Sequence, residues 1–186
     1  MAVPRIYKVE GIILKRRNTG ETDRIVTVFT KQYGKLRILA KGVRRVTSRR
    51  GPHLEIFSHV VLLVHRGKTL DTVSEIVPIT TFETIRVDLE RISVGYFYCE
   101  LVNTLLAEKQ EHLDVFSLLL NALQQLNRDH SDNIYNHSKH FALELLWILG
   151  FLPRSKSMGG KKLQDFVESI AEKRLHTPHF VRRLLS

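Results

Sequence analysis

The sequence predicts a mixed fold, with a small five-stranded β-barrel first and a small bundle of helices after it. Over residues 1–82, apolar and polar residues alternate in short segments, which is the period of a half-buried strand. Over residues 83–186, apolar residues recur three and four positions apart, which is the period of a helix. Tight turns separate the short segments, and a closed barrel leaves no unprotected strand edge. We therefore expect two domains, residues 1–82 and residues 83–186.

The strand segments of the first domain are rich in β-branched and aromatic residues and are bounded by turn signals. Residues 18–21 (NTGE) predict a hairpin turn, and residues 31–34 (KQYG) predict a second turn. The apolar run at residues 60–64 predicts a strand buried on both faces, and Pro78 is expected to end the last strand. The expected strands are residues 8–17, 23–31, 35–42, 56–65 and 69–77.

Helical spacing begins after Phe82, and cap residues bound several of the helices. Asp88 is expected to cap the first helix, and Gly150 to end the third. Thr177 and Pro178 predict the N-cap and first position of a short last helix. The apolar positions are Leu89, Ile92, Tyr96, Cys99, Val102 and Leu106 in the first helix, Leu113, Phe116, Leu120 and Leu123 in the second, Phe141, Leu145, Ile148 and Leu149 in the third, and Leu163, Phe166, Val167, Ile170 and Ala171 in the fourth.

The net charge of +10 is confined to the first domain. Residues 1–82 contain 16 Lys and Arg against 6 Asp and Glu, whereas residues 83–186 contain 13 of each kind. This asymmetry predicts a basic binding module followed by a neutral module with another role. Cys99 is the only cysteine, which fits a reducing cytosol and excludes a multi-cysteine zinc site within this sequence. Residues 1–8 lack a signal-peptide pattern, and no apolar run approaches the roughly 18 residues of a membrane span, so we expect no membrane association.

The densest basic stretch, residues 34–51, holds seven Lys and Arg. Alternation along its strand would place Leu36, Ile38 and Ala40 on the core side and the basic residues on a solvent-facing side. Oligonucleotide-binding (OB) folds bind single strands on the corresponding surface, and the alternative is a solvated face with a mobile loop. The residues expected to contact phosphates are Lys35, Arg37, Lys41, Arg44, Arg45, Arg49 and Arg50, with Lys15, Arg16, Arg17 and Arg24 extending the contact from neighbouring strands.

Aromatic residues near this stretch give a weaker signal. Phe29 is expected in the barrel core, because an aromatic residue within a barrel strand is usually buried. Tyr33 stands in a turn beside the basic strand. It could either pack in the core or stack on a base.

Three stretches of the sequence are similar, in order, to one known family. They are residues 11–30 (GIILKRRNTGETDRIVTVFT), 40–51 (AKGVRRVTSRRG) and 141–153 (FALELLWILGFLP). Together they resemble the RecO family of bacterial recombination mediators. The resemblance implies an OB-fold joined to a helical domain, binding of single- and double-stranded DNA, annealing without ATP and recombinase loading. It also implies a cytoplasmic, nucleoid-associated protein that binds RecR and the C-terminal tail of the single-stranded-DNA-binding protein.

The chain departs from that family after Pro153. Many members carry a four-cysteine zinc module there, where this chain has RSKSMGGKKL. We therefore expect no zinc and no other cofactor. Residues 154–186 have no counterpart in the resemblance.

Two other functions fit parts of the sequence. The barrel could bind RNA, as OB-fold proteins associated with ribosomes or tRNA do, or Glu21 and Asp23 could hold a metal ion in a nuclease. For these two acids we favour turn formation and ion pairing with Arg24 or Arg44, because no further acidic residues cluster nearby. A DNA-binding mediator without catalytic residues is the leading hypothesis.

The histidines and one glycine pair are interpreted as structural or surface features. His137 and His140 could share a helix face, but no carboxylate or cysteine stands at ligand spacing, so a surface pair is favoured over a metal site. Residues 159–162 (GGKK) lack the preceding strand and the spacing of a P-loop. The same structural or surface interpretation applies to His53, His59, His65, His176 and His179.

The helical half carries apolar residues on more than one helix face, around Phe97, Tyr98 and Leu101 and at residues 145–148. Such residues either pack in the core of the bundle or at its seam with the barrel, or they line a groove that takes the tail of a partner protein. Packing in the core or at the seam is the favoured interpretation.

Overall fold

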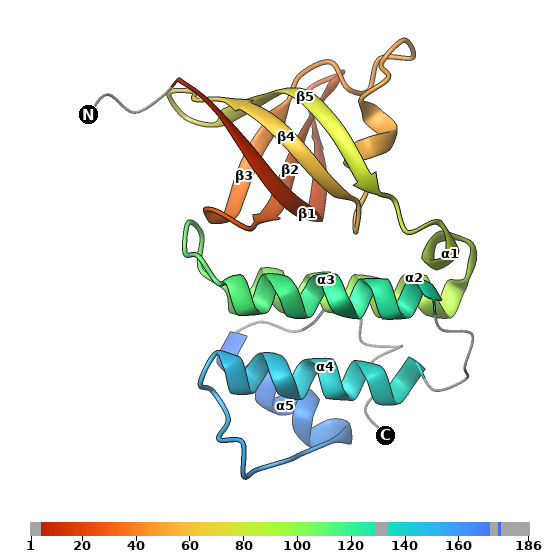
Figure 1. Ribbon diagram of the computed structural model, residues 1–186, viewed down its shortest axis with the longest axis vertical. Coiled ribbons are helices and arrows are strands. Elements are labelled where there is room, and N and C mark those ends of the chain that lie inside the picture. Colours follow the sequence, from red (N-terminus) through yellow and green to blue (C-terminus); the bar gives the residue numbers. More distant parts are fainter. Residues whose placement is uncertain (1–4, 129–133, 172–174, 176–186) are drawn as a thin grey trace. The chain divides into compact units, whose positions relative to one another are not determined.

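The computed structural model describes residues 5–128, 134–171 and 175, and these group into two compact units. The first unit takes in the chain up to Thr81 together with the segment Leu106–Leu113. The second takes in Phe82–Leu105 and the chain from Asp114 onward. Figure 1 shows strands in the first unit and helices in the second. The expected last helix at Thr177 lies outside the described residues, as do His176 and His179.

The strands of the first unit close into a barrel in the order β1-β2-β3-β5-β4, with β4 pairing back onto β1 (Figure 1). This order confirms the predicted five-stranded OB-fold barrel. Neighbouring strands run antiparallel, except that β3 and β5 pair in parallel at Ile38 and Leu39. The strands are β1 (Ile6–Thr19), β2 (Asp23–Thr30), β3 (Gly34–Ala40), β4 (His59–His65) and β5 (Asp71–Thr80).

The long strand β1 closes the barrel because its two halves pair with different strands. Its first half pairs with β4 and its second half with β2, and a register shift between Ile13 and Lys15 marks a bulge. Gly11 lies where the two halves overlap. A Cβ at Gly11 would come within 2.5 Å of a Val28 methyl carbon and 3.0 Å of the Phe29 carbonyl oxygen. A side chain at this position would therefore push β1 away from β2.

One face of each strand builds the barrel core. The buried residues are Val9, Ile13, Val26, Val28, Leu36, Ile38, Ala40, Val43, Leu54, Val60, Leu62, Val64 and Val73. The list includes Leu36, Ile38 and Ala40, which confirms that these residues of the third strand face the core. In β4, however, Val61 and Leu63 are only partly buried, so the expectation of burial on both faces is wrong. The outer side chains of a barrel strand point away from the core that the inner side chains share.

Strand β5 continues through Pro78, so the expectation that Pro78 ends the strand is wrong. Pro78 lies opposite Val60, next to a register shift at His59. Strand β5 pairs with β3 only at Asp71 and Thr72, so at Pro78 the ladder runs along one side of the strand. Proline is tolerated at bulges and strand edges, because no N–H has to be donated there.

The segment Leu106–Leu113 covers the part of β3 that β5 does not reach. Lys35 and Glu108 form a parallel bridge, and the Lys109 N–H donates to the Lys35 carbonyl at 3.0 Å. The Lys35 ammonium donates to the Leu106 carbonyl at 2.7 Å, and only 8% of the residue is exposed. The prediction that Lys35 faces solvent is therefore wrong. A buried ammonium needs hydrogen-bond acceptors, and the segment supplies one.

The second unit is helical, as predicted. The Asp88 carboxylate accepts the Arg91 N–H at 3.0 Å and so caps the first long helix as expected. Gly150, with φ of +74°, follows the helix that it was expected to end. No helix in the described ranges is long and apolar enough to cross a membrane. The helices are α1 (Glu83–Val87), α2 (Leu89–Leu105), α3 (Leu113–Arg128), α4 (Ile134–Ile148) and α5 (Gly160–Ala171).

The buried face of α2 differs from the predicted stripe. Leu89 is 78% exposed and Tyr96 is 39% exposed, whereas both were expected in the core. Helix α2 instead buries Val94, Phe97 and Leu101, together with other residues on more than one side. A helix that is apolar around most of its circumference contacts neighbours on several sides, so a single stripe of positions does not describe it.

A substitution at Gly34 tests the contact between β3 and the covering segment. Gly34 has φ of +65°, and a Cβ there would lie 1.9 Å from the Gln110 carbonyl oxygen. We expect Gly34→Ala to lower the free energy of unfolding by about 2–4 kcal/mol, measured by urea denaturation, because backbone strain adds to displacement of the segment. Gly20→Ala is the control, since Gly20 has φ of +56° and a Cβ there would meet no atom within 4 Å. It should lower the free energy of unfolding by only about 1–2 kcal/mol, and equal effects of the two variants would contradict the proposed contact.

Candidate nucleic-acid interface

Two rows of side chains cross the outer face of β1, β2 and β3. Lys15 lies opposite Thr27, and Thr27 lies opposite Arg37. Lys15 and Arg37 therefore stand two strands apart, about 10 Å. In the second row, Arg17 of β1 lies opposite Ile25 of β2, and Ile25 lies opposite Leu39 of β3. All three cations are exposed, so β1 and β3 carry positive charge on either side of the uncharged residues Thr27 and Ile25 of β2.

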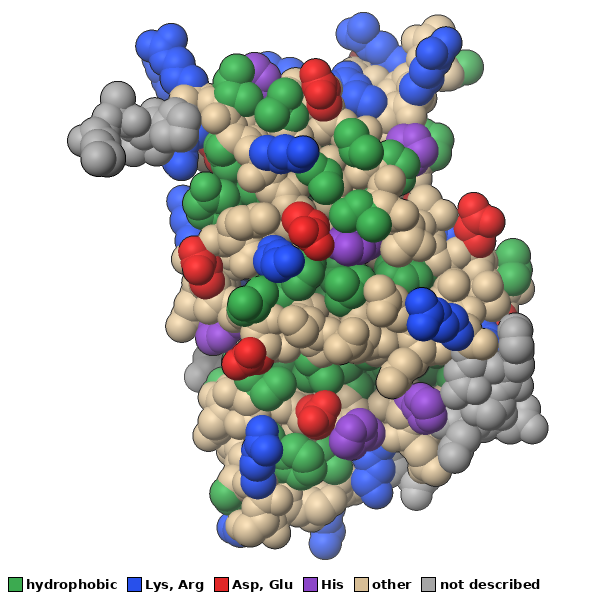
Figure 2. Space-filling view, viewed as in Figure 1, with side chains coloured by type: hydrophobic (Ala, Val, Ile, Leu, Met, Phe, Trp, Pro, Cys, Tyr) green, Lys and Arg blue, Asp and Glu red, His purple; other side chains and the backbone are tan. Residues whose placement is uncertain are grey.

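The loop formed by residues 41–50 continues from the end of β3 and is fixed to the turn between β1 and β2. The Gly42 N–H donates to the Asp23 carboxylate at 2.8 Å, and the Arg44 N–H donates to the Thr22 carbonyl at 2.9 Å. The Arg44 guanidinium also donates to a carbonyl of that turn, at 3.3 Å. Figure 2 shows Lys and Arg side chains gathered over this loop, at the upper right.

Arg50 fixes the other end of the loop. Its guanidinium donates to the Lys41 carbonyl at 3.0 Å and to the Ser74 carbonyl of β5 at 3.3 Å. The short 3-10 helix η1 (Gly51–Leu54) follows immediately. Arg50 thus joins both ends of the loop to β5, which limits how far the exposed arginines between them can move.

Seven exposed cations lie on the outer strand face and on the loop, and we call them the basic surface. All seven were expected from the sequence, either as phosphate contacts or as residues that extend the contact from neighbouring strands. The set is Lys15, Arg17, Arg37, Lys41, Arg44, Arg45 and Arg49.

Arg16 and Arg24 lie on the opposite face of the β1–β2 hairpin. Their cross-strand neighbours, Val26 and Ala40, belong to the barrel core. Both guanidinium groups donate to the same carboxylate oxygen of Glu55, Arg24 at a distance of 3.1 Å. A carboxylate therefore holds these two arginines away from the basic surface, although the sequence grouped them with it. No sequence signal pointed to Glu55 as their partner.

The Asp23 carboxylate orders the loop by accepting a hydrogen bond from the backbone of the loop. The hydrogen bond from the Gly42 N–H is the main cause that lowers the pKa of Asp23 below 3.8. The Thr22 hydroxyl also donates to this carboxylate, at 3.2 Å. The expected ion pair with Arg24 or Arg44 is therefore replaced by a backbone contact. Glu21, the other acid considered for metal binding, is exposed in the same turn.

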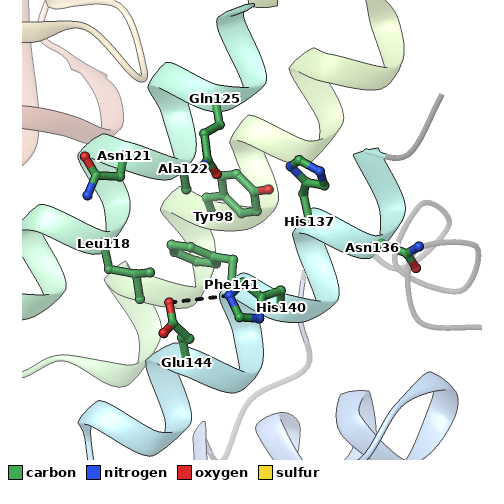
Figure 3. Close-up of a pocket in the computed structure, with 10 residues that line it drawn as sticks. All are labelled: Tyr98, Leu118, Asn121, Ala122, Gln125, Asn136, His137, His140, Phe141 and Glu144. Atoms are coloured by element: carbon green, nitrogen blue, oxygen red, sulfur yellow. Dashed lines mark ion pairs between the residues drawn. The ribbon is translucent and has the colours of Figure 1, made fainter. Parts of the chain in front are cut away.

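Among the described residues, His59, His137 and His140 occupy the structural and surface positions expected of them. His59 is buried in the barrel, with Nε2 3.0 Å from a Glu10 carboxylate oxygen. His137 and His140 lie on α4, and His140 is 3.8 Å from Glu144 (Figure 3). Within the described ranges, no group of three or more His, Cys, Asp or Glu residues is placed to hold a metal ion.

A hollow of about 440 Å³ lies between α2, α3 and α4 (Figure 3). Its lining mixes polar and apolar side chains, and Tyr98 and Phe141 pack against each other within it, with ring centroids 4.2 Å apart. Phe97, Leu101 and Leu145 are buried, which favours a packing role for them over an open groove. The polar residues of the lining are Asn121, Gln125, Asn136, His137, His140 and Glu144.

Phe29 and Tyr33 differ as the sequence suggested they would. Phe29 is fully buried, as expected, but it is not part of the cluster that fills the barrel, to which its neighbour Val28 belongs. Tyr33 is 40% exposed. Of the two rings, only Tyr33 offers surface to a ligand.

Family models match both units. The model described as Recombination protein O N terminal matches residues 1–82, and the model described as Recombination protein O C terminal matches residues 86–178. The chain belongs to the RecO family. The second match extends past Arg154, beyond the point where the motifs of the sequence suggested that the resemblance ends.

Relatives named DNA repair protein RecO are similar to this chain over most of its length. The RecO protein of Roseiflexus sp. strain RS-1 is 38% identical over 150 residues, which cover 81% of this chain and 52% of the relative. That of Symbiobacterium thermophilum is 35% identical over 151 residues, covering 80% of this chain and 58% of the relative. The chain thus spans a little over half the length of the curated RecO relatives it matches.

The pKa of Asp23 gives a prediction for the RecO barrel. Because this pKa is lowered in the folded protein, the ionised carboxylate stabilises the fold above pH 3.8, and that contribution disappears as the pH falls through the folded value. We expect Asp23→Asn to be less stable than the wild type near neutral pH, with the difference shrinking as the pH falls below 3.8. Urea denaturation over this pH range measures the difference. Glu21→Gln removes a charge from the same turn as a control, and a pH-independent difference for Asp23→Asn would contradict the prediction.

Proposed function

We propose that this chain binds single- and double-stranded DNA through the basic surface and promotes annealing without ATP during DNA repair and recombination. The observation that carries the proposal is the concentration of seven exposed cations on one strand face and its adjoining loop. Membership of a family whose curated relatives are named DNA repair proteins supports DNA as the polyanion. No catalytic residue is assigned, because the proposed activity makes and breaks no covalent bond.

Charge neutralisation explains how such a surface would help two strands pair. Lysines and arginines that contact phosphates release condensed counterions, and this release drives binding to any sequence. Two complementary strands held near the same basic surface also repel each other less. Pairing then requires only that the bases meet, since base stacking and hydrogen bonding between strands supply the remaining free energy.

The partners proposed with this function are RecR and the C-terminal tail of the single-stranded-DNA-binding protein. The family resemblance is the basis for proposing these two partners and recombinase loading. The basic surface by itself would account only for DNA binding and annealing. The helical unit, whose Lys and Arg are balanced by Asp and Glu, is the part we assign to protein contacts.

An annealing assay tests the central proposal. Two complementary oligonucleotides, one with a donor and one with an acceptor dye, are mixed without ATP, with and without this protein. We expect the protein to raise the rate of pairing, and to do so also when the strands are first coated with single-stranded-DNA-binding protein. A rate that does not change with protein concentration would overturn the proposal.

A double substitution tests the assignment of the basic surface. Arg44→Ala with Arg45→Ala should weaken binding to all sequences. On single strands it should also reduce the slope of log affinity against log salt by about 0.7 for each phosphate that is no longer neutralised. Fluorescence titrations over a range of salt concentrations measure this slope. Lys161→Ala with Lys162→Ala removes the same charge from exposed positions on α5 and should leave the slope unchanged. Equal effects of the two pairs would mean that net charge, rather than this surface, governs binding.

A further inference from the structure

A second hollow on the barrel, of about 340 Å³, has a chemistry different from that of the basic surface. It lies at the loop between β4 and β5, and two tyrosines, Tyr7 and Tyr33, line it together with Arg66 and Lys68. We call it the tyrosine pocket. Its volume is at the lower end of the range for sites that hold small ligands or single groups of larger ones. OB-folds use this loop, besides the strand face, to contact oligonucleotides.

Tyr7 is held rigidly within the tyrosine pocket. Its hydroxyl donates to the Asp71 carboxylate, and the Arg66 guanidinium lies over its ring, 5.0 Å from the centroid. The second Asp71 oxygen accepts the Gly67 N–H at 3.1 Å. Burial is the main cause that raises the pKa of Tyr7, so its hydroxyl stays protonated as a donor. Because both Asp71 oxygens accept bonds from the protein, this acid is engaged in shaping the loop.

Tyr33 presents the exposed ring of the tyrosine pocket. It meets Tyr7 edge to face, with centroids 5.4 Å apart and an interplanar angle of 77°. Its backbone is fixed, because the Tyr33 N–H donates to the Thr30 hydroxyl at 3.1 Å and Gly34 follows in close contact with Gln110. A tyrosine that is 40% exposed, with its backbone fixed and its ring packed on Tyr7, can stack on a base with little loss of conformational entropy.

The tyrosine pocket also carries positive charge. Three cations line it: Arg66, Lys68 and Lys109. The lining has two acids, Glu111 and Asp71, and both carboxylate oxygens of Asp71 already accept hydrogen bonds from the protein. Cations around an aromatic ring suit a nucleotide, because the base can stack while its phosphate is neutralised.

The tyrosine pocket is continuous with the basic surface. A neighbouring hollow of about 330 Å³ is lined by Arg37, which belongs to the basic surface. The two hollows share Leu36, Thr69, Asp71 and Lys109 in their linings. A strand that runs over the outer face of β1–β3 past Arg37 therefore reaches the tyrosine pocket without leaving the barrel.

We propose that the tyrosine pocket binds one base of single-stranded DNA, stacked on Tyr33, with the flanking phosphates near Lys68 and Lys109. This inference rests on the proposed function, because it extends the same DNA path. Bases in a duplex are stacked on their own neighbours and cannot enter without unpairing, at a cost in free energy. The tyrosine pocket thus favours single strands over duplex, whereas the basic surface binds both.

Substitution of Tyr33 separates stacking from charge. Tyr33→Ala should weaken binding of a single-stranded oligonucleotide about fivefold to a hundredfold at every salt concentration, without a change in the salt slope, because every cation that meets a phosphate is retained. Its affinity for duplex should stay as in the wild type. Tyr33→Phe keeps the ring and should bind single strands nearly as the wild type does. Melting curves of the variants show that each is folded.

A second measurement uses the wild-type protein, so it does not depend on how a variant folds. An oligonucleotide carrying 5-iodouracil is irradiated in complex with the protein, and crosslinks are mapped by mass spectrometry. We expect crosslinks at Tyr33. If Tyr33→Ala binds single strands like the wild type and no crosslink falls on Tyr33 or Tyr7, the inference is overturned while the proposed function stands. If the wild type binds no DNA, the proposed function fails and this inference fails with it.

Discussion

The pairing of β1 with two different strands is the constraint on which the rest of the barrel depends. The register shift between Ile13 and Lys15 lies in the β1–β2 ladder, just past the residues of β1 that pair with both β4 and β2. It also decides which side chains face outward, because Ile13 is buried in the core while Lys15 stands in the outer row with Arg37. A strand without this bulge would carry its later cations on a different face, since side chains alternate with a period of two.

Much of the fold follows from local sequence. Alternation identified the inner residues of β3, and short-range capping explained Asp88 and Gly150, because each of these features depends on residues within a few positions of one another. The basic loop was also found from composition, since exposed cations cluster along the chain as well as in space. These parts of the fold required no knowledge of distant contacts.

The errors arose where partners lie far apart in sequence. The Lys35 ammonium donates a hydrogen bond to a carbonyl 71 positions away, and Arg16 and Arg24 donate to Glu55, which lies 39 and 31 positions from them. Pro78 remains within β5 because it lies beside a register shift in the β4–β5 ladder. The tyrosine pocket was missed for the same reason: Tyr7, Tyr33 and Arg66 come from three separate stretches that only the closed barrel brings together.

The segment Leu106–Leu113 has a consequence for how the protein is made. It is translated after the whole of α2, yet it completes the edge of β3. A nascent chain that has emerged only as far as β5 therefore holds an unfinished barrel, in which the Lys35 ammonium lacks the Leu106 carbonyl as its acceptor. The strand unit reaches its final state only once the following helix has left the ribosome, which couples the maturation of one unit to the synthesis of the other.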